Sequence, residues 1–464
     1  MAAASASPRR PSRRPSLGLP IRPLSVPPGA AWRMAALWGG MNDAADHTVS
    51  VGTAWVNDAG QRARAASAVL ASAPDALRNG GLMGMAAALR GQAEVILAAN
   101  ERDVAGFQGS SAFRDRLLLT PARLEAVAAG LEEIAALADP LARTLAEWTR
   151  PNGLRFRRIA APLGVVGMIY ESRPNVGADA AGLCLKAGNA VILRGGSDSF
   201  FSATAILAAL REGLRKAGLP EDTVQAAPGP ERAYVAAMLG AAGFIDLIIP
   251  RGGRALVERV QREARVPVLA HADGLCHTYV HAAADPTMAR SIVANAKMRR
   301  TGVCGSTETL LIDASCAPVL LPALVDDLAA LGCRFVGDAR ARAIVPGMDV
   351  ATEEDFGTEW LDAKLSVAVV DGVDGALAHI ARFGSSHTEA IITQDTYVAE
   401  YFLARVGSAV ALWNASTQFC DGGEFGFGAE IGIATGKVHA RGPVGVEQLT
   451  TFRYVVTGTG QVRP

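Results

Sequence analysis

Residues 163–194 read LGVVGMIYESRPNVGADAAGLCLKAGNAVILR and carry the clearest structural signal in the chain. The first eight residues, LGVVGMIY, form a continuous apolar run, which is typical of a parallel strand buried on both faces. Residues 178–186 predict a helix, and AVILR at 190–194 predicts a second strand. A strand, a crossover helix and a second strand predict a parallel sheet, with ligands bound beyond the carboxyl ends of the strands.

The same alternation continues towards both ends of the chain. The later segments predict helices at 203–217, 254–263, 319–331 and 373–383 and strands at 244–250, 307–312, 365–370, 389–393 and 408–414. Residues 51–147 show a helical pattern, in which Asp115 and Thr120 are expected to start helices. The chain therefore predicts a doubly wound α/β fold with a helical layer in front of its first sheet.

Composition excludes several classes of partner. The 464 residues contain 45 basic and 45 acidic side chains, so no overall field favours nucleic acid. No apolar run approaches the roughly 18 residues that span a bilayer, so we expect no membrane partner. The six cysteines show no CxxC pair, which favours reduced thiols and a cytoplasmic location.

The first 46 residues differ from the rest of the chain. The first 42 carry six arginines and no acidic residue among repeated Pro, Ser and Ala, a disordered composition. Two interpretations stay open: a transit-like extension, or a mis-assigned start with initiation at Met34 or Met41.

Residues 295–312, NAKMRRTGVCGSTETLLI, place Cys304 between a helix and a buried strand. The helix is expected to end at Gly302, because glycine accepts left-handed dihedral angles cheaply. The strand is expected over residues 307–312. Cys304 is therefore predicted to lie at a helix-to-strand turn.

Three cations, Lys297, Arg299 and Arg300, precede this cysteine. Nearby positive charge stabilises a thiolate, so Cys304 is a candidate nucleophile. The alternative is that the cysteine serves as a small buried apolar residue.

Two glycine-containing loops join predicted strands to predicted helices, where backbone N–H groups favour a phosphate. Adjacent arginines favour the 2′-phosphate of NADP. The candidate cofactor-binding residues are Arg194, Gly195, Gly196 and Ser197 in the first loop, and Arg251, Gly252 and Gly253 in the second. Neither loop fits GxGxxG, and ordinary glycine-rich turns are the alternative.

A third glycine-rich run, DGGEFGFGAEIGI at 421–433, is too aromatic for a flexible linker and is expected to line a site. Metal ligation is not expected. The chain has no HExxH motif, and His271, Cys276 and His277 would point to different faces of a strand.

The chain resembles the gamma-glutamyl phosphate reductase branch of the aldehyde dehydrogenase superfamily over residues 51–463. The matching motifs are PLGVVGMIYESRPNVGADAAGLCLKAGNAVILRGG, HADGLCHTYV, NAKMRRTGVC, TETLL, SSHTEAIIT and DGGEFGFGAEIGIATGKVHARGPVGVEQLTT. The resemblance implies an aldehyde-dehydrogenase-like fold with two doubly wound parallel-sheet domains and a small β-flap for oligomerisation.

The resemblance also implies an activity, the NADPH-dependent reduction of L-glutamyl 5-phosphate to L-glutamate 5-semialdehyde in proline biosynthesis. Cys304 would be the nucleophile and form a thioester. Asn175, or the backbone N–H of Cys304, would stabilise the oxyanion. The candidate substrate contacts are Arg173, Lys297, His439 and Arg441; a surface salt bridge is the alternative for Arg173, and a subunit contact for His439 and Arg441.

Aldehyde-oxidising relatives carry a glutamate base where this chain reads VLAHADGLC, which favours reduction here. In the branch an asparagine commonly follows GVC, whereas this chain has Gly305. An NAD(P)-dependent aldehyde dehydrogenase of other substrate range is the alternative enzyme, and a non-catalytic binding module is the alternative class.

The predicted domains are an extension at 1–46, an NADP-binding domain at 47–265 with a flap strand near 150–160, a catalytic domain at 266–440 and an oligomerisation strand at 441–464. A homodimer or homotetramer is expected, because the two flap strands of the superfamily pair with a neighbouring subunit. The glutamate 5-kinase that supplies the substrate is a candidate partner.

Overall fold

The computed structural model describes residues 39–109, 111–270 and 273–463. Its internal contacts separate two units, Met1–Thr48 and Val49–Pro464, and apart from the start of the first helix the features below belong to the second. Helix α1 (Gly39–Leu70) begins before residue 46, so regular structure starts earlier than the composition predicts. The remainder of the predicted extension, residues 1–38, lies outside the described residues.

The first parallel sheet forms around the strand–helix–strand unit at 163–194. Its strands lie in the order β5 (Val224–Ala226), β4 (Ala190–Arg194), β3 (Val165–Tyr170) and β6 (Leu247–Arg251). All six residues of β3 are buried, as its unbroken apolar run predicts. The chain runs from β3 through β4 to β5 and then returns to the other side of β3. This reversal places a ligand-binding crevice at the carboxyl ends of β3 and β6.

Helices cover this sheet, and two hydrophobic clusters pack most of them against its strands. The helices are α2 (Asp75–Gly91), α3 (Ala93–Gly106), α4 (Ser111–Leu117), α5 (Pro121–Ala136), α6 (Val176–Lys186), α7 (Phe200–Lys216), α8 (Arg232–Leu239) and α9 (Arg254–Glu263). Thr120 caps α5 as predicted, since its hydroxyl accepts from the Arg123 N–H at 3.2 Å. Asp115 lies inside α4, so the prediction that it starts a helix is wrong.

Helices α2 and α7 cross where two glycines meet. A Cβ on Gly213 would lie 2.5 Å from the backbone of Gly84, closer than real Cβ atoms approach. We expect Gly213→Ala to lower the free energy of unfolding by about 1–3 kcal/mol, because the packed helices must separate. The matched control is Gly130→Ala in α5, where a Cβ meets nothing within 4 Å. The control should be neutral or slightly stabilising in urea unfolding; equal effects of the two substitutions would contradict the close crossing.

The second parallel sheet has seven strands. Their order is β10 (Asp349–Val350), β9 (Arg334–Gly337), β11 (Lys364–Val370), β8 (Thr307–Asp313), β7 (Cys276–Val280), β12 (Thr388–Ile392) and β13 (Val410–Trp413). The central strands β7, β8 and β12 are buried along their whole length. The accompanying helices are α10 (Pro286–Met298), α11 (Ala317–Ala330), α12 (Ala339–Ile344), α13 (Glu353–Phe356), α14 (Gly372–Phe383) and α15 (Thr396–Arg405).

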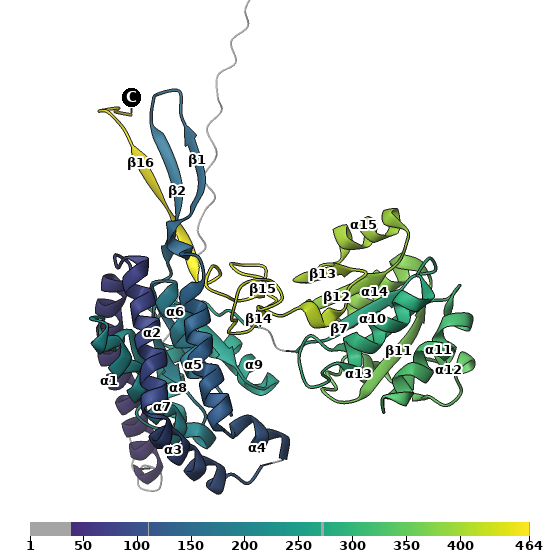
Figure 1. Ribbon diagram of the computed structural model, residues 1–464, viewed down its shortest axis with the longest axis horizontal. Coiled ribbons are helices and arrows are strands. Elements are labelled where there is room, and N and C mark those ends of the chain that lie inside the picture. Colours follow the sequence, from purple (N-terminus) through teal and green to yellow (C-terminus); the bar gives the residue numbers. More distant parts are fainter. Residues whose placement is uncertain (1–38, 110, 271–272, 464) are drawn as a thin grey trace, which may run out of the picture. The chain divides into compact units, whose positions relative to one another are not determined.

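A separate antiparallel sheet forms the predicted flap. It consists of β1 (Thr144–Thr149), β2 (Arg155–Pro162) and β16 (Thr450–Thr457), and Figure 1 shows the yellow strand β16 beside the blue strand β2. The helical pattern assigned to residues 51–147 was wrong at its end, where β1 begins. A short ladder, β14 (Ile433–Ala434) with β15 (Gly442–Pro443), completes the strands. Two parallel-sheet units and a β-flap confirm the predicted architecture, whereas the domain boundaries stay predictions.

No single helix within the described part of the chain is long and apolar enough to cross a membrane. The helices α2 and α3 pass that test only as a pair, and they are bent by 68° at their break.

Candidate active site

A cavity of about 840 Å³ is lined from both parallel-sheet units. Its walls come from the loop after β3, the end of β6, the turn before β8 and the glycine-rich run at 421–433, which was expected to line a site. The charged lining residues are Asp115, Arg116, Arg123, Arg173, Asp179, Arg251, Arg299, Arg300, Glu359, Asp421 and Glu430. Several arginines in one cavity favour an anionic ligand.

Cys304 lies in the wall of this cavity, in the turn between α10 and β8. The turn position agrees with the prediction, but α10 ends at Met298 rather than at Gly302. The side chain is half-buried, so a ligand in the cavity can reach the sulfur. The structure therefore does not seal Cys304 in apolar packing.

The surroundings of Cys304 leave it protonated at neutral pH. The pKa of the thiol is raised to about 11, mainly by burial, and the carboxylates of Glu430 and Glu359 act in the same direction. The positive charge of Arg251 lowers the pKa, but it does not outweigh burial. A thiolate at this position thus depends on cationic help within the cavity.

The cation that lowers the pKa of Cys304 is Arg251, not one of the three that precede the cysteine in sequence. Lys297 is fully buried and forms an ion pair with Glu308, at 2.6 Å between Nζ and Oε2. It does not line the cavity, so the structure does not place it where it could contact substrate. Arg299 and Arg300 do line the cavity. The sequence pattern indicated Arg251 only as a cofactor-binding candidate; its effect on the Cys304 pKa was not predicted, because that arginine is distant in the chain.

The loop after β3 contributes Arg173 and Asn175 to the same cavity. The Asn175 amide donates to Asp179 Oδ2 at 3.0 Å, and burial raises the pKa of that aspartate to about 6. Burial and the nearby charges of Arg251 and Arg116 lower the pKa of Arg173 to about 10, which leaves it charged at neutral pH. Both residues therefore lie in the same cavity as Cys304, and their expected roles stay predictions.

The first glycine-containing loop lines a second cavity of about 500 Å³. Arg194, Gly196 and Ser197 lie in its wall together with Arg232 and Arg259. Gly195 is not among the lining residues; a Cβ there would meet the ring of Tyr170 at 3.1 Å. This cavity lies at the carboxyl end of β4, where a parallel sheet binds its ligand.

The second glycine-containing loop is arranged differently. The Gly253 N–H donates to Glu171 Oε2 at 3.0 Å, and a Cβ on Gly252 would lie 2.4 Å from the same oxygen. Neither glycine lines the second cavity, and Arg251 lines the cavity that contains Cys304. The loop is thus packed against Glu171, and the predicted cofactor role of its three residues finds no support in this arrangement.

His439 and Arg441, the other expected substrate contacts, lie outside the Cys304 cavity. His439 Nε2 is 2.8 Å from the carbonyl oxygen of Gln448, and Arg441 donates to the Gly407 carbonyl at 2.7 Å. Both side chains hold backbone segments, so the structure does not bring them to the nucleophile.

Two acidic residues that sequence reasoning did not select face the nucleophile. Burial raises the pKa of Glu430 to about 7, and its Oε2 is buried without a hydrogen-bond partner among the described residues. Glu359 Oε1 accepts from the Gly274 N–H at 2.9 Å. The predicted lining run at 421–433 contains Glu430, whereas nothing in the sequence pattern indicated Glu359. The absence of a glutamate from VLAHADGLC therefore does not leave the cavity without carboxylates.

No group of three or more His, Cys, Asp and Glu side chains within residues 39–109, 111–270 and 273–463 could hold a metal ion. His271, one of the residues weighed for ligation, lies outside the described residues.

Two parallel-sheet units line the cavity that contains Cys304, and a strand-to-helix loop of the first unit lines a second cavity. The aldehyde dehydrogenase family model matches residues 43–347, which is more than half of the chain. The chain belongs to the aldehyde dehydrogenase family.

Comparison with individual relatives places the chain in one branch of that family, the gamma-glutamyl phosphate reductases. The gamma-glutamyl phosphate reductase of Acidiphilium cryptum is 70% identical over 403 residues, which cover 87% of this chain and 96% of that protein. The one from Rhodospirillum rubrum is 57% identical over 427 residues, which cover 91% of this chain and 100% of that protein. The crystal structure of the Thermotoga maritima gamma-glutamyl phosphate reductase superposes with a TM-score of 0.86 at 39% identity, covering 88% of this chain and all of that one.

More distant structures share the fold alone. An engineered glycolyl-CoA reductase with bound NADP+ has a TM-score of 0.63 at 16% identity and covers 87% of this chain and 96% of that one. The predicted branch and the aldehyde-dehydrogenase-like fold are both confirmed.

Proposed function

We propose that this protein reduces L-glutamyl 5-phosphate to L-glutamate 5-semialdehyde with NADPH and releases phosphate, as a step of proline biosynthesis. The observation that carries the proposal is a reachable cysteine in a cavity lined by arginines, in a chain 70% identical to a gamma-glutamyl phosphate reductase. An acyl phosphate is both anionic and activated, so it suits this combination of charge and nucleophile.

The covalent step is assigned to Cys304. Its thiolate attacks the acyl carbon, the bond from that carbon to the phosphate oxygen breaks, and phosphate leaves with the bonding electrons. The product is a thioester on Cys304. The Asn175 amide or the Cys304 backbone N–H is proposed to stabilise the oxyanion during this attack.

The arginines of the cavity are proposed to bind the phosphate group. Arg116, Arg173, Arg299 and Arg300 line the cavity. Within the described part of the chain none of the four makes an ion pair with an acidic side chain, unlike Arg123 in the same cavity, which pairs with Asp115 at 2.8 Å, so their charges are available to a ligand. Guanidinium groups match the geometry of phosphate oxygens, which favours this assignment over a general electrostatic role.

The second cavity is proposed to bind NADPH. Arg194 Nε is buried without a partner among the described residues, and Arg232 and Arg259 lie in the same wall. Three arginines beside a strand-to-helix loop fit a 2′-phosphate, which supports NADPH over NADH. When bound, the cofactor supplies the hydride that reduces the thioester to the aldehyde and frees the cysteine.

The flap is proposed to pair with a second copy of the chain in a homodimer or homotetramer. Trp148, Phe452 and Tyr454 expose 39%, 47% and 55% of their surface, so the three-stranded sheet presents aromatic area that a partner could cover. All six cysteines are free, which supports the cytoplasm as the location.

The kinase that makes the acyl phosphate stays a candidate partner, and the only ground for it is that this kinase supplies the substrate.

Phosphate dependence tests the proposed reaction. In the oxidative direction, we expect reduction of NADP+ by glutamate semialdehyde only when inorganic phosphate is present, because phosphate must accept the acyl group from Cys304. The measurement is NADPH absorbance with and without phosphate, using propionaldehyde as the control substrate. Phosphate-independent oxidation, or faster oxidation of propionaldehyde, would favour the alternative of an aldehyde dehydrogenase of other substrate range.

A further inference from the structure

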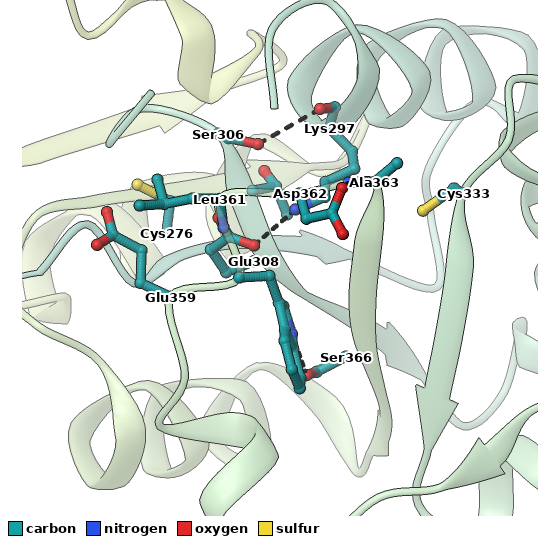
Figure 2. Close-up of polar contacts among 12 residues, drawn as sticks. Cys276, Lys297, Ser306, Glu308, Cys333, Glu359, Leu361, Asp362, Ala363 and Ser366 are labelled. Carbon is teal, nitrogen blue, oxygen red and sulfur yellow. Dashed lines mark hydrogen bonds and ion pairs between the residues drawn. The ribbon is translucent and has the colours of Figure 1, made fainter. Parts of the chain in front are cut away.

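A buried ion pair connects the two ends of the turn that carries Cys304 (Figure 2). Lys297 is on α10, before the turn, and Glu308 is on β8, after it. Their Nζ and Oε2 atoms are 2.6 Å apart, and the two residues are 0% and 1% exposed. The Ser306 hydroxyl also donates to the Lys297 carbonyl at 3.3 Å, so an ion pair and a hydrogen bond both connect the two ends of the turn.

The second oxygen of Glu308 extends the connection to another wall of the cavity. Glu308 Oε1 accepts from the Leu361 N–H at 3.3 Å. Leu361 has a φ of +50°, a conformation that a non-glycine residue keeps only when its surroundings impose it. Leu361 and Glu359 both line the Cys304 cavity. The ion pair therefore helps to hold the loop that carries these two lining residues.

This loop leads back to the nucleophile. Glu359 Oε1 accepts from the Gly274 N–H at 2.9 Å. Gly274 lies directly against the cysteine, since a Cβ added to it would be 2.6 Å from Cys304 Cα. The contacts thus form a closed ring from Cys304 through the ion pair, Leu361, Glu359 and Gly274 to Cys304 again.

Stability alone does not account for the pair. Burial raises the pKa of Glu308 to about 7, even though Lys297 and the Leu361 N–H both lower it. The two charges have therefore been taken from water at a substantial cost. Apolar residues of similar volume often stabilise a protein as well as a buried ion pair does.

We propose that the Lys297–Glu308 ion pair is a positioning device that sets the Cys304 turn and the loop at 359–361 in their reactive arrangement. It rests on the proposed function in one respect, that Cys304 is the nucleophile. Neither charged group lines the cavity, so both act through the residues that they hold. Small displacements of a nucleophile lower its rate strongly, which gives this role a measurable effect.

The test replaces both charges together, as Lys297→Met with Glu308→Leu, so that no unpaired charge stays buried. The matched control is Lys186→Met with Asp75→Asn. Lys186 is also fully buried and pairs with Asp75 at 2.9 Å, but this second ion pair lies on α6 and α2, away from Cys304. The readouts are the melting temperature, kcat, and the rate of Cys304 alkylation by iodoacetamide, followed by mass spectrometry of its peptide.

We expect the Lys297/Glu308 variant to lose roughly tenfold to a hundredfold in both alkylation rate and kcat. The control variant should keep both rates within about twofold while its melting temperature changes by a similar amount. A folded Lys297/Glu308 variant that reacts as fast as the control would overturn the proposal. If the double variant does not fold, Glu308→Gln takes its place. We expect the same loss in alkylation rate and kcat, and unchanged rates would again overturn the proposal. If Cys304→Ser retained turnover, Cys304 would not be the nucleophile and the proposed function would lose its covalent step, whatever result the ion-pair variants give.

Discussion

Replacing Cys304 with serine is expected to lower kcat by about a thousandfold or more, the scale seen when a covalent nucleophile is removed. A hydroxyl is close in size to a thiol, so the half-buried position should accept serine without unfolding. Serine fails as a nucleophile here because its hydroxyl ionises far less readily than a thiol. The measurement is NADPH oxidation with L-glutamyl 5-phosphate, together with the melting temperature.

Cys316→Ser is the matched control for this substitution. Cys316 is also partly exposed, but its sulfur lies near the carbonyl oxygens of Asp313 and His281, and it does not line the cavity. We expect the control to retain full activity. A folded Cys304→Ser protein with turnover close to that of the unsubstituted protein would make Cys304 a packing residue and remove the thioester from the proposed mechanism.

Replacing Arg251 with methionine is expected to slow both alkylation and turnover by about tenfold, because one pKa unit changes the thiolate fraction tenfold. Arg251 lowers the Cys304 pKa, which burial raises to about 11. Loss of the arginine should therefore move the pKa upward. Below the pKa, less thiolate would be present at every pH.

The check is the pH dependence of Cys304 alkylation. The rate should rise with pH in both proteins, and the curve of Arg251→Met should be displaced to higher pH. Arg262→Met is the control, since Arg262 lies on α9 and pairs with Glu263 at the surface. Coincident curves for Arg251→Met and the unsubstituted protein would show that the guanidinium does not act on the sulfur.

Periodic patterns predicted most of the fold correctly. The apolar runs predicted the bounds of β3, β4 and β8 to within two residues. The turn that holds Cys304 was predicted from the helix before it and the strand after it. These elements can be predicted from the sequence because the apolar residues of a buried strand or an amphipathic helix recur at a fixed spacing within a few residues. Strand β1 was missed for the same reason, since five of its six residues are exposed and it has no apolar period.

The charges around the nucleophile could not be predicted in this way. Lys297 is close to Cys304 in sequence, yet its charge is matched by Glu308 inside the protein. Arg251 and Glu430 are distant in sequence, yet both act on the Cys304 pKa. Residue order determines which segments become strands and helices, because their hydrogen bonds and burial are local. Electrostatic effects depend on distance through space and on the loss of water, and the packing of sequence-distant segments sets both.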